Sequence, residues 1–215
     1  AAGINLLLQK FAHTLPSNAY LIQPDGDLGR YTGALPDVNP GLGLIEYGTV
    51  STFYPSLNGD VGKFGVSQTW STLRNTTTSA SGRPGGTAKS IEVNASGSTN
   101  IFSHMSKIFT LFDTSDLPDS TTITDATLGL VAISGSITND RADSLTMVAT
   151  NPASDATLVT ADFTAVTYTK QATDIALSGI TADSSAFTSF TLNATGLSNI
   201  DVTGISKFGI VALKE

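Results

Sequence analysis

The sequence contains no cysteine in its 215 residues, and only 13% of its residues are charged. Without cysteine, neither disulfide bonds nor thiolate metal sites can hold the fold together, so stability must come from an apolar core or from assembly. The charged share is well below the roughly 25% of an average globular protein. Thr, Ser, Asn and Gly recur in nearly every segment and must cover the surface instead. Such a hydroxyl-rich, β-branched surface favours exposed strand faces over exposed helix faces.

Long apolar runs and excess positive charge are missing as well. No segment approaches the roughly 18 apolar residues that a membrane-spanning helix needs. The chain does not open with a basic stretch followed by an apolar one, so we expect either a protein without a secretion signal or one whose signal has been removed. The formal net charge is −7, which repels a phosphate backbone. We therefore expect neither a membrane span nor a nucleic-acid partner.

The common catalytic motifs are also absent. The two histidines, His13 and His104, do not form an HxxxH or HExxH spacing, which argues against a zinc hydrolase. The glycine-rich residues 82–86 lack the Lys-Ser/Thr that follows in a phosphate-binding loop. The aspartates within residues 113–119 fit a turn, where Asp bonds its own backbone. We predict that the chain is not an enzyme.

Short β-prone runs recur in the second half of the chain, separated by segments rich in Asp, Asn, Ser, Gly and Pro. This spacing is typical of a sandwich, and only one short helix is expected, after Asp162. We predict an all-β, jelly-roll-like β-sandwich with Leu111, Leu128, Leu130 and Phe208 in the core between facing sheets. The expected strands are residues 108–112, 126–133, 144–149, 187–192 and 208–213.

The first quarter of the chain has a different composition. Residues 15–55 carry five prolines, at positions 16, 24, 36, 40 and 55, interleaved with glycines, and both residue types interrupt sheet ladders. Connections this long are usually functional, disordered or draped over a partner. We predict a Pro/Gly-rich N-terminal arm over residues 1–59 that makes assembly contacts, followed by the sandwich over residues 60–215. A mobile surface loop is expected at residues 75–86.

The segment Ile4–Phe11 is the most apolar part of this arm, and two interpretations remain open for it. Ile4, Leu7, Leu8 and Phe11 have helical spacing. Leu6, Leu7 and Leu8 are consecutive, which also suits an extended arm inserted into a neighbour, and an ordinary strand or helix within the chain is the simpler version of both. A lone molecule should not leave these side chains exposed, so we expect a partner to cover them. The candidate assembly residues are Ile4, Leu6, Leu7, Leu8 and Phe11.

Residues 107–119, KIFTLFDTSDLPD, followed by TITDATL at 122–128, resemble the LxFDxSxLPxxAxIxxAxLxL segment of the jelly-roll domains named for a DNRLRE signature. Residues 190–209 are similar to the closing part of these domains, and residues 62–73 to their opening strand. The DNRLRE signature itself is missing. The resemblance implies a jelly roll similar to carbohydrate-binding modules, of the kind found in tailed phages and surface proteins.

Two binding sites follow as candidates. Trp70 is the one aromatic residue of residues 60–215 that we assign as a candidate glycan contact, with core packing as the alternative. Asp25 and Asp27 are the best candidates for calcium ligands, because calcium is bound by carboxylate and carbonyl oxygens. The group of Asn139, Asp140 and Asp143 comes second. No other cofactor is expected.

These observations lead to one expected function and two alternatives. We expect a structural virion protein of a tailed phage, a head decoration or fibre-type subunit, located on the virion surface or outside the cell. Its partners would be copies of itself, other virion or surface subunits, and a cell-surface glycan. The alternatives are a secreted carbohydrate-binding module and a cell-surface filament subunit assembled by strand addition.

Overall fold

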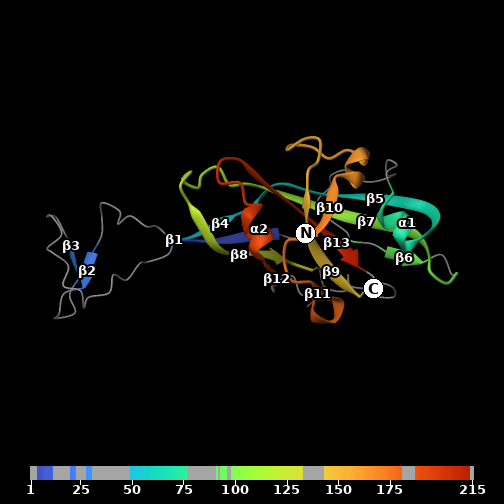
Figure 1. The fold of residues 1–215 in the computed structure, drawn as a ribbon, viewed down its shortest axis with the longest axis horizontal. Coiled ribbons are helices and arrows are strands. Elements are labelled where there is room, and N and C mark those ends of the chain that lie inside the picture. The colour runs from blue at the N-terminus through green and yellow to red at the C-terminus, as the bar shows by residue number, and fades with distance from the viewer. Residues whose placement is uncertain are drawn as a thin grey trace.

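The computed structural model describes residues 4–11, 20–22, 28–30, 49–76, 91, 93–95, 98–132, 143–180 and 187–213, with side chains from residue 51 onward. Antiparallel strands dominate these residues and form two packed sheets, so the predicted all-β sandwich is confirmed (Figure 1). A separate pair consists of β2 (Tyr20–Ile22) and β3 (Leu28–Arg30). The helices are short: α1 (Trp70–Arg74), η1 (Thr160–Thr164), η2 (Leu177–Gly179) and α2 (Ala194–Ser198).

The smaller sheet has four strands. In spatial order they are β12 (Thr188–Thr191), β8 (Thr122–Leu130), β1 (Ile4–Phe11) and β4 (Thr49–Phe53). The larger sheet has a main path with two short strands beside it, β11 (Ile175–Ala176) along β9 and β6 (Val93–Ala95) along β7. The main path is β10 (Val166–Lys170), β9 (Ser144–Thr150), β13 (Ile205–Leu213), β7 (Ile101–Asp113) and β5 (Pro55–Thr69).

Successive strands cross between the two sheets. The chain passes from β7 to β8, from β8 to β9 and from β12 to β13, changing sheet each time. Each expected strand of the second half overlaps an observed one. The turn expected after Asp113 is present, and Asp113 bonds its own loop: its carboxylate accepts from the backbone N–H and the hydroxyl of Ser115.

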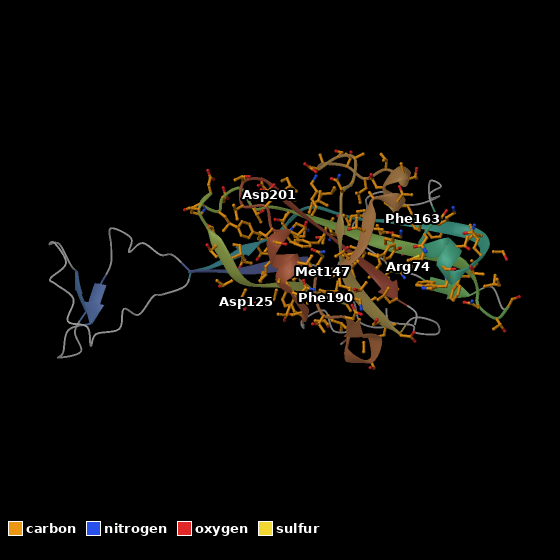
Figure 2. All side chains as sticks on the ribbon, in the orientation of Figure 1. Arg74, Asp125, Met147, Phe163, Phe190 and Asp201 are labelled. Carbon is orange, nitrogen blue, oxygen red and sulfur yellow. The ribbon has the colours of Figure 1, made fainter. Side chains whose placement is uncertain are left out.

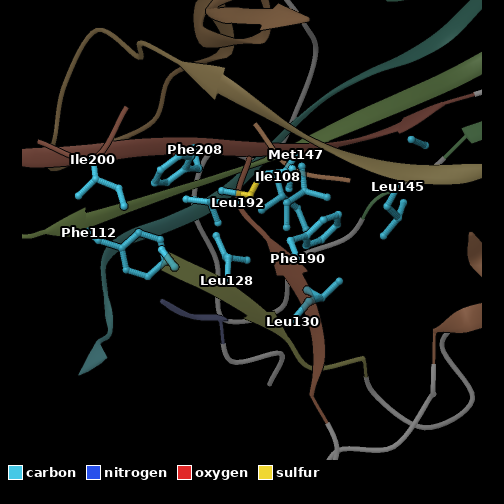
Figure 3. Close-up of a cluster of buried hydrophobic side chains, with 14 of the residues drawn as sticks. Ile108, Phe112, Leu128, Leu130, Leu145, Met147, Phe190, Leu192, Ile200 and Phe208 are labelled. Carbon is cyan, nitrogen blue, oxygen red and sulfur yellow. The ribbon is translucent and has the colours of Figure 1, made fainter. Parts of the chain in front are cut away.

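The main core lies between the two sheets (Figure 3). Leu128 and Leu130 of β8 meet Phe208 of β13 there, as predicted. Leu111 is also buried, but it lies in a second apolar cluster. The reason is the two-residue period of a strand: Ile108 and Phe112 of β7 point into the main core, whereas Leu111 points to the opposite face of the same sheet.

The second cluster covers the outer face of the larger sheet. Trp70 and Leu73 of α1, with Leu158 and Phe163 of the segment 151–165, pack on this face. A sheet that is buried on both faces needs strands that are apolar throughout, and β7 is buried without interruption from Met105 to Phe112. The alternation expected of a simple sandwich therefore does not hold for this strand.

The helix expected after Asp162 begins two residues earlier. Asp162 lies inside η1 rather than at its N-cap, and its carboxylate accepts from the backbone N–H groups of Val159, at 2.8 Å, and Ala153, at 2.9 Å. This buried carboxylate ties the segment 151–165 to itself. Phe163 points inward and is fully buried.

Strands on both sides of the expected domain boundary belong to the sandwich. The boundary at residue 59 falls inside β5, and β1 and β4 are strands of the smaller sheet. Ile4–Phe11 is therefore a strand within the sandwich of its own chain. It is neither a helix nor an arm that extends away from the sandwich. This segment has helical spacing but forms a strand, because pairing with β8 on one side and β4 on the other satisfies its backbone hydrogen-bonding groups.

One glycine gives a direct test of packing around α2. A Cβ on Gly196 would collide with the carbonyl oxygen of Gln171 and press on Leu192. We expect Gly196→Ala to lower the free energy of unfolding by about 1–3 kcal/mol, the usual cost of overpacking. Gly179→Ala is the matched control, because a Cβ there meets nothing within 4 Å. Chemical denaturation of both variants checks this, and equal stabilities would contradict the packing described.

Candidate functional site

The position of β1 is the feature of the structure most relevant to assembly. β1 lies between β8 and β4 and is antiparallel to both. Its register sets Ile4 opposite Leu130, Leu6 opposite Leu128 and Leu8 opposite Ala126. Leu130, Leu128 and Ala126 are buried. The alternate residues of β1 are thus in register with the residues of β8 that build the main core.

β4 depends on β1 for its place in the sheet. Within the described residues, β1 is the strand that pairs with β4, with Leu6 opposite Phe53 and Lys10 opposite Thr49. Taking β1 away would leave β8 with an unpaired edge and would detach β4 from the sheet. Exposed unpaired edges are templates for pairing with another chain.

A long connection joins β1 to β4, from residue 12 to residue 48. Its two short strands, β2 and β3, pair with each other. Connections of this length inside a domain are usually functional or lie against a partner. The candidate assembly residues, for which a helix and an extended segment were both open, lie in the strand β1, and their side chains lie outside the part that the structure describes.

Two large aromatic side chains are exposed at opposite edges of the smaller sheet. Tyr54 follows β4 and is 72% exposed, and Phe187 precedes β12 and is 55% exposed. A Cβ on Gly129 of β8 would meet the Phe187 ring, so this ring lies over the outer face of the sheet. Phe187 opens the strand predicted over residues 187–192 and was not singled out. Its spacing of three residues from the buried Phe190 is the sequence signal for the opposite face of that strand.

Trp70, the candidate glycan contact, is packed in the second apolar cluster. It begins α1, retains only 9% exposure and packs against Phe102, with ring centroids 5.3 Å apart. A sugar stacks on an open aromatic face, and this indole is covered on the inside of the second cluster. The alternative interpretation of core packing holds for Trp70.

The second cluster holds a buried cation that the sequence analysis missed. Lys107 of β7 is 1% exposed, and its ammonium donates to the carbonyl oxygen of Phe163 at 2.8 Å. The same nitrogen lies 3.9 Å from the centroid of the Phe163 ring. Burial, and then repulsion from the Arg74 guanidinium, lower the pKa of Lys107 to about 7. The sequence signal for this buried cation is a single lysine within the largely apolar residues 105–112.

Arg74 and Tyr168 complete this polar group (Figure 2, where Arg74 and Phe163 lie at the same end of the sandwich). The guanidinium of Arg74 lies 4.0 Å from the centroid of the Tyr168 ring. The Tyr168 hydroxyl donates to the Arg74 carbonyl at 3.0 Å, and burial raises the pKa of Tyr168 to about 12. These contacts hold α1 and η1 against the larger sheet, so Lys107, Arg74 and Tyr168 have a structural role.

Of the calcium candidates, only Asp143 lies within the described residues. Asp25 and Asp27, and also Asn139 and Asp140, lie outside them. Elsewhere in the described part of the chain, no group of three or more His, Cys, Asp or Glu side chains is placed to hold a metal ion. Among the described helices, none has the length and apolar character needed to cross a membrane.

Comparisons of the chain with known family profiles, with curated proteins and with solved structures find no match.

Proposed function

We propose that this chain is a structural subunit that assembles with copies of itself on a surface outside the cell, with the virion of a tailed phage as its setting. In that role it is a head decoration or fibre-type subunit that presents the sandwich outward and has no catalytic task. The observation that carries the proposal is the position of β1 near the start of the chain, between β8 and β4 and paired with both strands.

Composition and resemblance support the same setting. The chain is acidic, free of cysteine and rich in Thr, Ser, Asn and Gly, so a β-rich subunit of this composition depends on its core and on assembly rather than on disulfides for stability. The segment that resembles the DNRLRE-type domains runs through the end of β7, the turn after Asp113 and the start of β8. Phe112, Leu117 and Leu128, which stand at apolar positions of that pattern, are buried.

A carbohydrate-binding module is the second candidate function. The exposed rings of Tyr54 and Phe187 favour it over the buried Trp70, but they flank opposite edges of one sheet and do not form a common platform. A weak, single-ring contact is the most that either offers to a sugar.

Sedimentation of the purified chain over a range of concentrations separates these functions. A structural subunit should form regular assemblies as the concentration rises. A chain that keeps the mass of one molecule at every concentration, and binds a glycan on an array with loss on Tyr54→Ala or Phe187→Ala, would favour the second candidate instead.

A further inference from the structure

We propose that copies of this chain assemble by exchanging β1, so that β1 of one molecule fills the position between β8 and β4 of the next. This inference rests on the proposed function and specifies its contact. The partner it names is a second copy of the same chain. Three observations support it: the position of β1, its register, and the length of its connection to β4.

The contacts of β1 do not depend on which molecule supplies it. β1 is bonded to β8 and β4 through backbone ladders, with Leu6 opposite both Leu128 and Phe53. A second copy of the chain offers the same residues in the same order. The exchanged strand would restore every one of these pairings, which is why swapping identical elements is a low-cost route to assembly.

The match of residues favours this chain's own β1 over an unrelated strand. Ile4, Leu6 and Leu8 stand in register with the buried Leu130, Leu128 and Ala126, and a slip of one residue would place every second residue on the wrong face. The register shifts between Gln9 and Lys10, where β8 carries the extra residue, Thr124.

The connection to β4 decides between the closed and the exchanged form. Residues 12–48 are long enough, at up to about 3.3 Å per residue, to span well beyond one sheet. A segment tethered to its own chain has an effective concentration of about 1 mM or less, and this value falls as the number of linking residues grows. In dilute solution the closed form should therefore win, whereas subunits packed at a comparable local concentration should exchange.

Cysteine pairs placed by register test the exchange in a chain that has no cysteine of its own. Leu7 and Thr127 are directly opposite, which is within disulfide reach for an antiparallel pair. Leu7→Cys and Thr127→Cys are made in separate full-length molecules, mixed at high concentration and oxidised. Lys10→Cys mixed with Thr127→Cys is the matched control, because Lys10 is opposite Ile123, four residues away.

We expect at least tenfold more disulfide-linked dimer from the matched mixture than from the control. The double variant Leu7→Cys/Thr127→Cys, diluted, should instead close a disulfide within one chain, which verifies folding and register. If assemblies form but the matched mixture gives no more dimer than the control, exchange is wrong and the proposed function stands. If the mixture keeps the mass of one chain at every concentration, the proposed function fails, and exchange fails with it.

Discussion

Raising the pH from 7 to 10 should stabilise the protein against unfolding. The pKa of Lys107 is about 7 in the folded chain and 10.5 when unperturbed, so in this window the unfolded chain binds more protons than the folded one. The free energy of unfolding should then rise with pH by up to about 1.4 kcal/mol per unit. The pKa of Tyr168, raised from 10.0 to about 12, acts in the opposite sense above pH 10, where its contribution is lost. The free energy of unfolding should therefore be highest near pH 10, where the rise due to Lys107 ends and the fall due to Tyr168 begins.

Lys107→Met isolates this effect. The variant keeps an unbranched side chain of similar length but cannot take up a proton, so its unfolding free energy should be nearly flat between pH 7 and 10. The lost hydrogen bond to the Phe163 carbonyl changes the absolute stability, and the slope is the readout. Lys170→Met is the control, because the side chain of Lys170 is 52% exposed and pairs with Asp174 at the surface. Denaturant titrations at each pH give the slopes, and a wild-type slope in Lys107→Met would contradict the assignment.

Deleting residues 1–11 should abolish cooperative unfolding of the isolated chain. β1 contributes eight residues that pair with β8, five of which also pair with β4, and each net hydrogen bond is worth about 0.5–1.5 kcal/mol. Their sum is comparable to the 5–15 kcal/mol by which a typical domain is stable. Removing a peripheral arm would leave the sandwich intact. Removing β1 would not, because it detaches β4 and leaves β8 with an unpaired edge, and both strands belong to the sandwich.

A synthetic peptide of residues 1–11 should restore a cooperative thermal transition to the deleted chain, with a midpoint that rises with peptide concentration. A peptide of the same composition in scrambled order is the control, because it cannot match Leu130, Leu128 and Ala126 in register. A deleted chain that unfolds cooperatively at the wild-type temperature without peptide would show that β1 is not part of the folded sheet.

The strands of the second half were predictable because each lies between strong turn residues. The run at residues 144–149 became β9, and the run at 208–213 became most of β13. Their burial also followed from apolar content, as Phe208 shows. Local pattern was sufficient here because each strand is bounded by Asp, Asn, Ser, Gly or Pro.

Long-range pairing was beyond the reach of the same reasoning. Leu111 was expected between the sheets, yet the second apolar cluster on the outer face depends on α1 and Phe163, which are far from it in sequence. Ile4–Phe11 had a helical spacing, and its strand form depends on β8 and β4. The burial of Trp70 and of Lys107 likewise depends on segments that meet only in the folded chain.

Assembly through exchanged β1 strands is tested by the mass of the full-length chain, measured by sedimentation over a concentration series with and without an excess of the peptide of residues 1–11. We expect assemblies that grow with concentration and are dispersed by this peptide, while the scrambled peptide leaves them unchanged. The mass of a single chain at every concentration, or assemblies that ignore the peptide, would contradict it.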